Sequence, residues 1–267
     1  MRIFCASTGR CGTLFLSEMF RAMTRVPSFH EPLPWCIGRT LEWINNGNGN
    51  GHDWKAEADA EVEKKVAQVK SDTSKDGLYF ESSNMFIKAY AERMLDEFRD
   101  IACIYLYRNP VEVLISHHKK CTEQEIDWIL QPQWRRNRLR TLKEMSFYET
   151  VLWQWYEVQE RYLSLKPRFK KTYEFDFRKI NDINEWSRLF EHFGVEVKAK
   201  ATMPNLRTNN IPGVTESDLK QITDKWDKPG MPAEEALTKK RKVQAIRAAL
   251  DAGDKIMAQA SVREPVA

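Results

Sequence analysis

The stretch RIFCASTGRCGTLFLSEMFRAM, residues 2–23, decides the fold predicted for this chain. Its opening run, RIFCA, is apolar and predicts a buried strand. A turn containing Gly9 and Gly12 follows, and apolar side chains such as Phe15 and Met19 then recur at helical spacing. The stretch therefore predicts a strand, a glycine turn and a helix in direct succession.

The glycine turn has the composition of an anion site. A strand-to-helix turn gathers unpaired backbone N–H groups at the positive end of the helix dipole, which suits a phosphate or a sulfate. A loop for ATP or GTP would read GxxxxGK[ST], with a lysine that reaches the outer phosphates. Here Thr13 and Leu14 follow Gly12, and the cation is Arg10. Many such turns bind nothing, so the turn alone leaves both interpretations open.

Length and composition indicate a globular protein. The 267 residues are 42% hydrophobic and 11% aromatic, which is enough for one well-buried domain over residues 1–267. Lysine and arginine total 42 against 38 acidic residues. This net charge of +4 permits anionic ligands but is too slight to indicate nucleic acid by itself.

Cysteine usage and hydropathy lead us to expect a soluble, cytoplasmic protein. The five cysteines are odd in number and widely spaced, unlike a disulfide framework or a zinc site, which indicates a reducing compartment. The sequence has no basic-then-apolar leader and no stretch that approaches about eighteen apolar residues. We therefore expect no membrane anchor.

Strands alternate with helices along the chain. Further strands are predicted at Leu78–Glu81, Ile101–Tyr107 and Lys171–Asp176. Helices are predicted over 57–70, 85–98, 145–165 and 183–193, and the first of them is expected to be exposed. This order predicts an α/β fold with a central, mainly parallel sheet flanked by helices, a helical C-terminal part, and ligands at the carboxyl ends of the strands.

Two segments are expected to be loosely structured. A loop rich in glycine and asparagine lies at about residues 45–53, and the polar tail at about residues 258–267 is expected to fray. Neither segment has the features of a domain boundary.

A second strand-to-helix junction, YRNPVEVLISHH (residues 107–118), carries another pair of anion-binding side chains. Arg108 follows the predicted buried strand, Pro110 suits the first turn of a helix, and Ser116 lies eight residues after Arg108. A guanidinium and a hydroxyl two helical turns apart can grip a terminal phosphate. The alternative is an ordinary ion pair at a helix start beside a solvated hydroxyl.

Together, the two junctions make the sequence resemble sulfotransferases that use 3′-phosphoadenosine 5′-phosphosulfate (PAPS). TGRCGTLFL resembles the loop [KR]-S-G-T-T that holds the 5′-phosphosulfate, and YRNPVEVLISHH resembles the R-[DN]-P run with a following serine that holds the 3′-phosphate. The resemblance extends from Met1 to about Phe175. It implies a P-loop-like sulfotransferase fold, in-line transfer of a sulfuryl group to a hydroxyl or an amine, and no metal.

The resemblance also implies which residues contact the cofactor: Thr8, Gly9, Arg10, Cys11, Gly12, Thr13, Leu14, Arg108 and Ser116. Arg207 is a further candidate, since the family often brings a basic loop over the 3′-phosphate. Cys11 and Leu14 stand where the family has a serine and a threonine, so two hydroxyls are lost from the loop, and Thr8 and Thr13 are the residues that would replace them.

The catalytic base is expected from another segment. The family's cytosolic members use a histidine at a position that falls in FESSN, at Ser83, where no histidine is available. Glu31 lies 21 residues after Arg10, where some carbohydrate- and tyrosine-directed sulfotransferases carry a base glutamate. Glu31 is the first candidate and His30 the second, although HEP also suits an ordinary helix-ending turn. Glu81 is expected to face the acceptor, unless it pairs with a nearby lysine.

Two other functions compete with this interpretation. A kinase of related topology is disfavoured by the missing GK[ST], and a nucleic-acid-binding protein that uses WRRNRLR (residues 134–140) is disfavoured by the slight net charge. We therefore predict a PAPS-dependent enzyme with a small-molecule or carbohydrate acceptor and no nucleic-acid partner. The sequence leaves the acceptor and the oligomeric state open.

Overall fold

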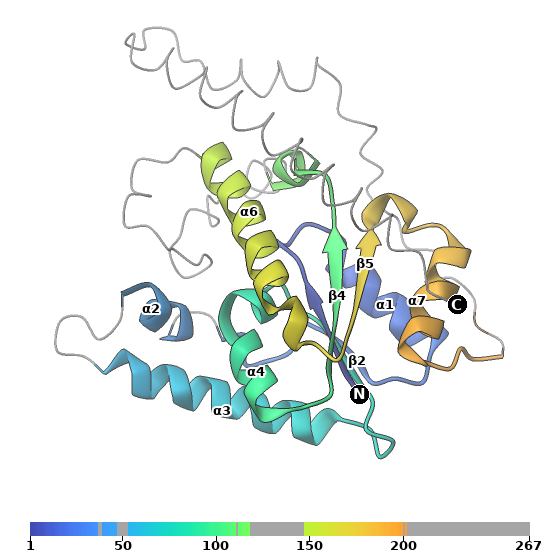
Figure 1. Ribbon diagram of the computed structural model, residues 1–267, viewed down its shortest axis with the longest axis horizontal. Coiled ribbons are helices and arrows are strands. Elements are labelled where there is room, and N and C mark those ends of the chain that lie inside the picture. The colour runs from blue at the N-terminus through green and yellow to red at the C-terminus, as the bar shows by residue number, and fades with distance from the viewer. Residues whose placement is uncertain (37–38, 47–52, 111, 118–146, 200, 202–267) are drawn as a thin grey trace, which may run out of the picture.

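The protein folds around one parallel sheet with helices on both of its faces (Figure 1). The computed structural model describes residues 1–36, 39–46, 53–110, 112–117, 147–199 and 201. Within this part of the chain the strand order is β2-β3-β1-β4-β5, and every neighbouring pair is parallel. The strands are β1 (Arg2–Ala6), β2 (Ser28–His30), β3 (Tyr79–Ser82), β4 (Ile101–Tyr107) and β5 (Lys171–Asp176). The predicted α/β class with a mainly parallel, helix-flanked sheet is therefore confirmed.

Strands β1 and β4 are central and bring the two sequence motifs together. Arg2 pairs with Ile101 at one end of the ladder, and Ala6 pairs with Tyr105 at the other. Every residue of β4 is buried, because its apolar side chains are covered on both faces. Since the two strands are parallel, the loops that follow them open at the same edge of the sheet.

One face of the sheet is covered by α1 (Thr13–Met23) and α7 (Ile183–Phe193), which pack against each other. The ring of Phe20 on α1 stacks on Phe80 of β3 with centroids 3.8 Å apart, and it meets the edge of Phe190 on α7 at 5.2 Å. These aromatic contacts fix the direction of α1 and therefore the position of the glycine turn before it.

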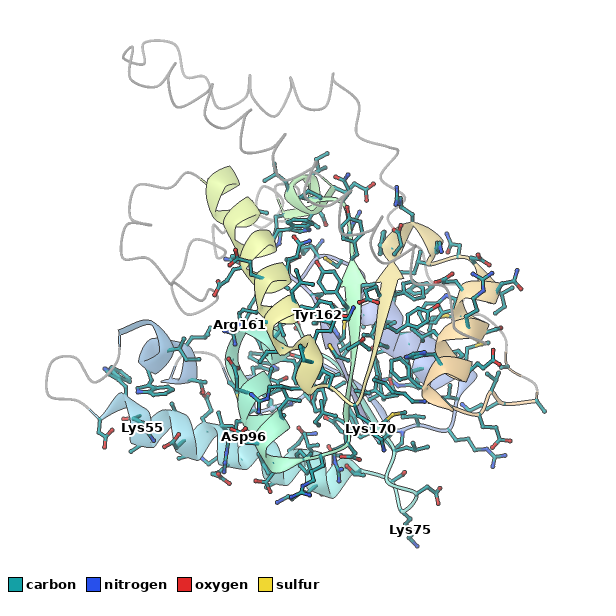
Figure 2. All side chains as sticks on the ribbon, viewed as in Figure 1. Lys55, Lys75, Asp96, Arg161, Tyr162 and Lys170 are labelled. Carbon is teal, nitrogen blue, oxygen red and sulfur yellow. The ribbon has the colours of Figure 1, made fainter. Side chains whose placement is uncertain are left out.

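The opposite face is covered by α6 (Phe147–Leu165) and by a π-helical turn, η2 (Phe86–Tyr90), that continues into α4 (Ala91–Glu97). Tyr162 of α6 stacks on Tyr105 of β4 at 4.5 Å, and Arg161 Nε donates to the carbonyl of Ile87 at 2.7 Å. Both α6 residues are labelled in Figure 2. The helix is thereby fixed to the sheet and to η2.

Two further helices pack against each other, the first of them also against η2 and the second against α4. They are α2 (Arg39–Asn46) and α3 (Trp54–Asp72), and the short 3-10 helices η6 (Lys166–Arg168) and η7 (Phe177–Lys179) flank β5. The prediction that the 57–70 helix is exposed was wrong for one face. Val62, Val66 and Val69 form a narrow apolar stripe that is buried, whereas charged residues such as Lys55 and Glu63 on the same helix are exposed.

The structure corrects several predicted boundaries. Strand β3 begins and ends one residue later than predicted, and β2 was not predicted at all. The loop expected at about 45–53 is shorter, because Asn45 and Asn46 belong to α2 and the Asp53 side chain accepts from the N–H of Ala56 to cap α3.

Some predictions concern residues outside the described part of the chain. These are the remainder of that loop, Arg207, the WRRNRLR run and the tail at 258–267. Among the described helices, none combines the length and apolarity needed to cross a membrane.

Candidate active site

The loop between β1 and α1, residues 7–12, leads directly into the N-terminus of α1 and is called the anion loop below. Gly9, Arg10 and Gly12 all have left-handed backbone, with φ of 87°, 54° and 90°. Such residues turn successive N–H groups towards one side. Gly12 caps α1 without a side-chain acceptor, and the first turn of α1 carries no acidic residue. The loop therefore presents positive polarity to an anion.

Gly12 is required for two independent reasons. Its positive φ is unfavourable for other residues, and a Cβ at this position would lie 2.5 Å from Cε2 of Phe177. The glycine in the predicted motif is thus fixed by backbone conformation and by the packing of η7 against the loop.

Two side chains shape the anion loop from within. The Thr8 hydroxyl donates to the carbonyl of Gly9 at 3.0 Å and lies 3.1 Å from Cys11 Sγ, which is also 3.1 Å from the same carbonyl. Both side chains are buried, and burial raises the pKa of the Cys11 thiol, so it stays protonated at neutral pH. Thr13 is buried as well, whereas Leu14 is 55% exposed.

Direct hydrogen bonds join the anion loop to residues 108–116. Arg108 Nη1 donates to the carbonyl oxygen of Arg10 at 2.8 Å, and Arg10 Nε donates to Ser116 Oγ at 3.2 Å. Arg108 is 6% exposed, and its guanidinium lies 4.3 Å above the ring of Phe177 and pairs with Glu112 at 3.1 Å. The two motifs that the sequence separates by about a hundred residues therefore come together at one edge of the sheet.

The two candidate bases lie at the end of β2. His30 is the last residue of the strand, and its Nδ1 lies 3.0 Å from the backbone carbonyl oxygen and 3.1 Å from the hydroxyl oxygen of Ser82 on β3. Glu31 follows with φ of 46°, so its backbone is in the left-handed region. Its Oε1 accepts from Asn84 Nδ2 at 2.6 Å. Segment 30–31 is thus a strand end rather than the helix end considered from the sequence.

Asn84 and Lys88 were missed by sequence analysis, and they lie between Glu31 and the anion loop. A Cβ on Gly9 would lie 3.6 Å from Asn84 Cγ. Lys88 Nζ donates to Asn84 Oδ1 at 3.1 Å and to the carbonyl of Thr8 at 3.2 Å. Burial lowers the pKa of Lys88 to about 8, although Glu157 and Glu31 oppose this change. The sequence signal was a lysine inside the apolar helical run FIKAY, where a charged residue is unusual.

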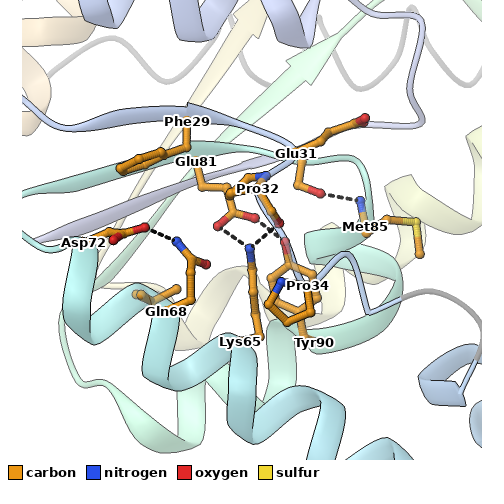
Figure 3. Close-up of polar contacts among 12 residues, drawn as sticks. Phe29, Glu31, Pro32, Pro34, Lys65, Gln68, Asp72, Glu81, Met85 and Tyr90 are labelled. Atoms are coloured by element: carbon orange, nitrogen blue, oxygen red, sulfur yellow. Dashed lines mark hydrogen bonds and ion pairs between the residues drawn. The ribbon is translucent and has the colours of Figure 1, made fainter.

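Glu81 does not face an open crevice, and the expectation that it contacts the acceptor needs correction. Its carboxylate is completely buried and pairs with Lys65 Nζ of α3 at 2.9 Å (Figure 3). The hydroxyls of Tyr79 and Tyr90 each donate to it at 2.5 Å. Lys65 Nζ also donates to the carbonyl of Pro32 at 3.1 Å. We therefore assign Glu81 to a buried ion pair beneath the Glu31 segment, the lysine-paired alternative raised from the sequence.

Ser83 also points inward. It is 2% exposed, and its Oγ accepts from the N–H of Met85 at 3.2 Å, which satisfies a backbone donor before η2. This contact gives Ser83 a local structural role.

His117 is a further buried group that sequence analysis did not select. Burial and the neighbouring charges of Lys88, Arg10 and Arg108 lower its pKa well below the usual value, so the imidazole is neutral at physiological pH. It extends the set of site groups on the helix that also carries Ser116.

Comparisons with known proteins identify relatives of this arrangement. A family model described as "Sulfotransferase domain" matches residues 1–181. The sulfotransferase domain from the curacin biosynthetic pathway superposes with a TM-score of 0.50 and 16% identity, covering 91% of this chain and 96% of that one. A sulfotransferase from Alicyclobacillus acidocaldarius gives a TM-score of 0.45 and 14% identity, covering 93% and 95%. At such identities the structural likeness concerns the fold alone. No curated protein sequence matches the chain.

Proposed function

Because the chain belongs to the sulfotransferase domain family, we propose that it transfers a sulfuryl group from PAPS to a hydroxyl or an amine of a small-molecule or carbohydrate acceptor. One observation carries the proposal. The anion loop and residues 108–116 are joined by the Arg108–Arg10 and Arg10–Ser116 hydrogen bonds, at the adjacent ends of β1 and β4. A nucleotide with a phosphosulfate and a separate phosphate needs two such anion sites next to each other.

The chemistry of these groups fits the cofactor. The anion loop offers backbone N–H groups and the Arg10 guanidinium, which suit a phosphosulfate, and α1 begins with no carboxylate to repel it. Arg108 and Ser116 offer a planar charged fork and a hydroxyl, which suit a terminal phosphate. The loop lacks the lysine of a nucleoside triphosphate site, which disfavours a kinase.

We assign the charge-stabilising role to Arg10. When bound, PAPS supplies an activated sulfuryl group on a phosphate leaving oxygen. Arg10 lies in the left-handed turn of the anion loop, and its Nε donates to Ser116 Oγ, so its positive charge is held where the loop meets the helix after β4. Preorganised charge of this kind favours a transition state in which negative charge grows nearby.

We assign the role of general base to Glu31, with His30 as the second candidate. Among the described residues, Asn84 is the one side chain that donates to the Glu31 carboxylate, and it occupies a single oxygen, Oε1. The second oxygen can then accept a proton from the acceptor. His30 has its Nδ1 committed to Ser82, which leaves Nε2 as its basic atom.

Ligand-dependent thermal unfolding tests the cofactor assignment. The melting temperature should rise with 3′-phosphoadenosine 5′-phosphate, and it should stay constant with ATP plus magnesium and with an oligonucleotide, because only a ligand that prefers the folded state stabilises it. A rise with ATP plus magnesium alone would favour a kinase, and a rise with the oligonucleotide alone would favour a nucleic-acid-binding protein.

An acceptor screen tests the reaction itself. Candidate alcohols, phenols, amines and sugars would be incubated with PAPS and the protein, and the products examined for a mass gain of one sulfuryl group.

We further propose that the enzyme acts as a single domain in the cytoplasm. The described cysteines Cys5, Cys11, Cys36 and Cys103 are free thiols, which supports a reducing compartment.

A further inference from the structure

The side-chain amide of Asn84 is used at both ends. Its Nδ2 donates to Glu31 Oε1 at 2.6 Å, and its Oδ1 accepts from Lys88 Nζ at 3.1 Å. If the amide were flipped, so that Oδ1 and Nδ2 exchanged places, its oxygen would face the Glu31 carboxylate and its N–H groups would face the Lys88 ammonium. The charges on the two sides therefore select one orientation of Asn84.

Lys88 connects this amide to the anion loop. The side chain is 4% exposed, and its ammonium donates to the backbone carbonyl of Thr8 at 3.2 Å and to Gln154 Oε1 of α6 at 3.5 Å. A lysine ammonium has three N–H donors, which matches these two acceptors and Asn84. Lys88 thus links the loop after β1, the segment after β3 and α6.

The titratable groups around Lys88 come from several elements. Glu157 lies on α6, Glu31 follows β2, and Cys11 belongs to the anion loop. His117, on the helix after β4, is held neutral partly by the charge of Lys88. The ammonium is therefore balanced by carboxylates on one side while it holds the loop carbonyl on the other.

We propose that Asn84 and Lys88 form a positioning bridge, which holds the Glu31 carboxylate at a fixed place relative to the anion loop. The proposal rests on the proposed function, in which Glu31 is the general base. Glu31 has a left-handed backbone and a long side chain, so its carboxylate needs an external contact to stay in one place. The bridge supplies that contact and ties it to the loop assigned to the sulfuryl donor.

A double-mutant cycle tests the bridge. Asn84→Ala should lower kcat by about tenfold or more, while the KM for PAPS changes by less than about twofold, because the loop and its N–H groups remain. In a Glu31→Gln background the same change should lower the residual kcat by less than about twofold, because no base is left to position. Gln68→Ala is the matched control, since Gln68 is also a half-buried amide that donates to a carboxylate, Asp72 at 2.7 Å.

Lys88→Met provides a second, independent variant. It should lower kcat. The double variant Lys88→Met with Asn84→Ala should lose much less kcat than the product of the two single losses. Lys88→Met should also lower the affinity for 3′-phosphoadenosine 5′-phosphate, measured by calorimetry, because the Thr8 carbonyl loses its hydrogen-bond donor. Melting temperatures verify that each variant is folded, and Asn84→Ser replaces Asn84→Ala if the latter fails to fold.

The outcomes separate the bridge from the proposed function. Suppose that the wild type transfers sulfuryl groups and that Glu31→Gln abolishes most transfer. If Asn84→Ala then lowers kcat by the same factor in the Glu31→Gln background as in the wild type, the bridge is wrong and the proposed function stands. If Glu31→Gln retains wild-type kcat, the base assignment fails and the bridge fails with it.

Discussion

At the scale of single residues, Arg10 is the cation on which the proposed chemistry depends most. Arg10→Ala should lower kcat more than it weakens cofactor affinity, because the charge that faces Arg10 grows in the transition state and only such differential contacts raise kcat. Steady-state kinetics with PAPS would measure both, and Arg10→Lys should recover part of the loss. An intact kcat with a raised KM would instead make Arg10 a ground-state clamp.

Arg108 has a different expected role, the recognition of the 3′-phosphate. Arg108→Ala should weaken the binding of 3′-phosphoadenosine 5′-phosphate by about 2 kcal/mol or more, which is the scale of a lost charge-assisted hydrogen bond. The wild type should prefer this nucleotide to the analogue without the 3′-phosphate, and the variant should not. Calorimetric titration of both proteins with both nucleotides checks the prediction, and equal affinities for the wild type would remove Arg108 and Ser116 from the site.

At the scale of structural elements, the Lys65–Glu81 pair joins α3, β3 and the segment that carries Glu31. Both side chains are 0% exposed, and Lys65 also holds the carbonyl of Pro32. Lys65→Met and Glu81→Leu should each reduce the free energy of unfolding by about 3–5 kcal/mol, because each leaves one buried charge unpaired.

The double variant of this pair should lose less stability than the sum of the single variants, since neither charge is then left in the interior. Urea unfolding of the four proteins measures the cycle. The exposed pair of Lys70 and Glu97 offers the control, and the coupling measured by its cycle should be much smaller, because solvent screens the two charges. Fully additive losses at Lys65 and Glu81 would show that the two charges are not coupled.

The elements also show which signals the sequence contains. Strand β4 was predicted with its observed bounds because IACIYLY is apolar throughout and long enough to be a buried strand. Strand β2 has only three residues, SFH, and its ladder partner β3 lies about fifty residues away. Nothing local distinguishes such a strand from a turn, so the position of Glu31 at a strand end was not predictable.

The candidate site divides in the same way. Arg10, Arg108 and Ser116 were selected because their spacing around two strand ends is itself a local pattern. Asn84 and Lys88 act through partners on other elements, namely Glu31 and the Thr8 carbonyl, and those pairings exist only after the sheet has assembled. For Glu81 two alternatives were open from the sequence, and the choice between them depends on where α3 brings Lys65.

At the scale of the whole molecule, Lys88 connects the site to global stability. The amine of Lys88 is buried in the folded protein, and burial lowers its pKa from 10.5 to about 8. Between about pH 8 and about pH 10 the unfolded chain holds this proton and the folded protein does not, so the Lys88 contribution to stability rises with pH. The two pKa values correspond to a change of about 3 kcal/mol once the full range is crossed.

Comparison with Lys88→Met isolates this contribution, because other groups titrate in the same range. Burial raises the pKa of the thiols of Cys5, Cys11 and Cys103, and these thiols make the folded state less stable as pH rises past their unfolded values. The free energy of unfolding of the wild type minus that of Lys88→Met should increase from about pH 7 to about pH 10. The same difference for Lys70→Met, at an exposed site, serves as the control. If the difference for Lys88→Met does not change with pH, the buried ammonium keeps its proton, because Glu157 and Glu31 fully compensate the cost of burying its charge.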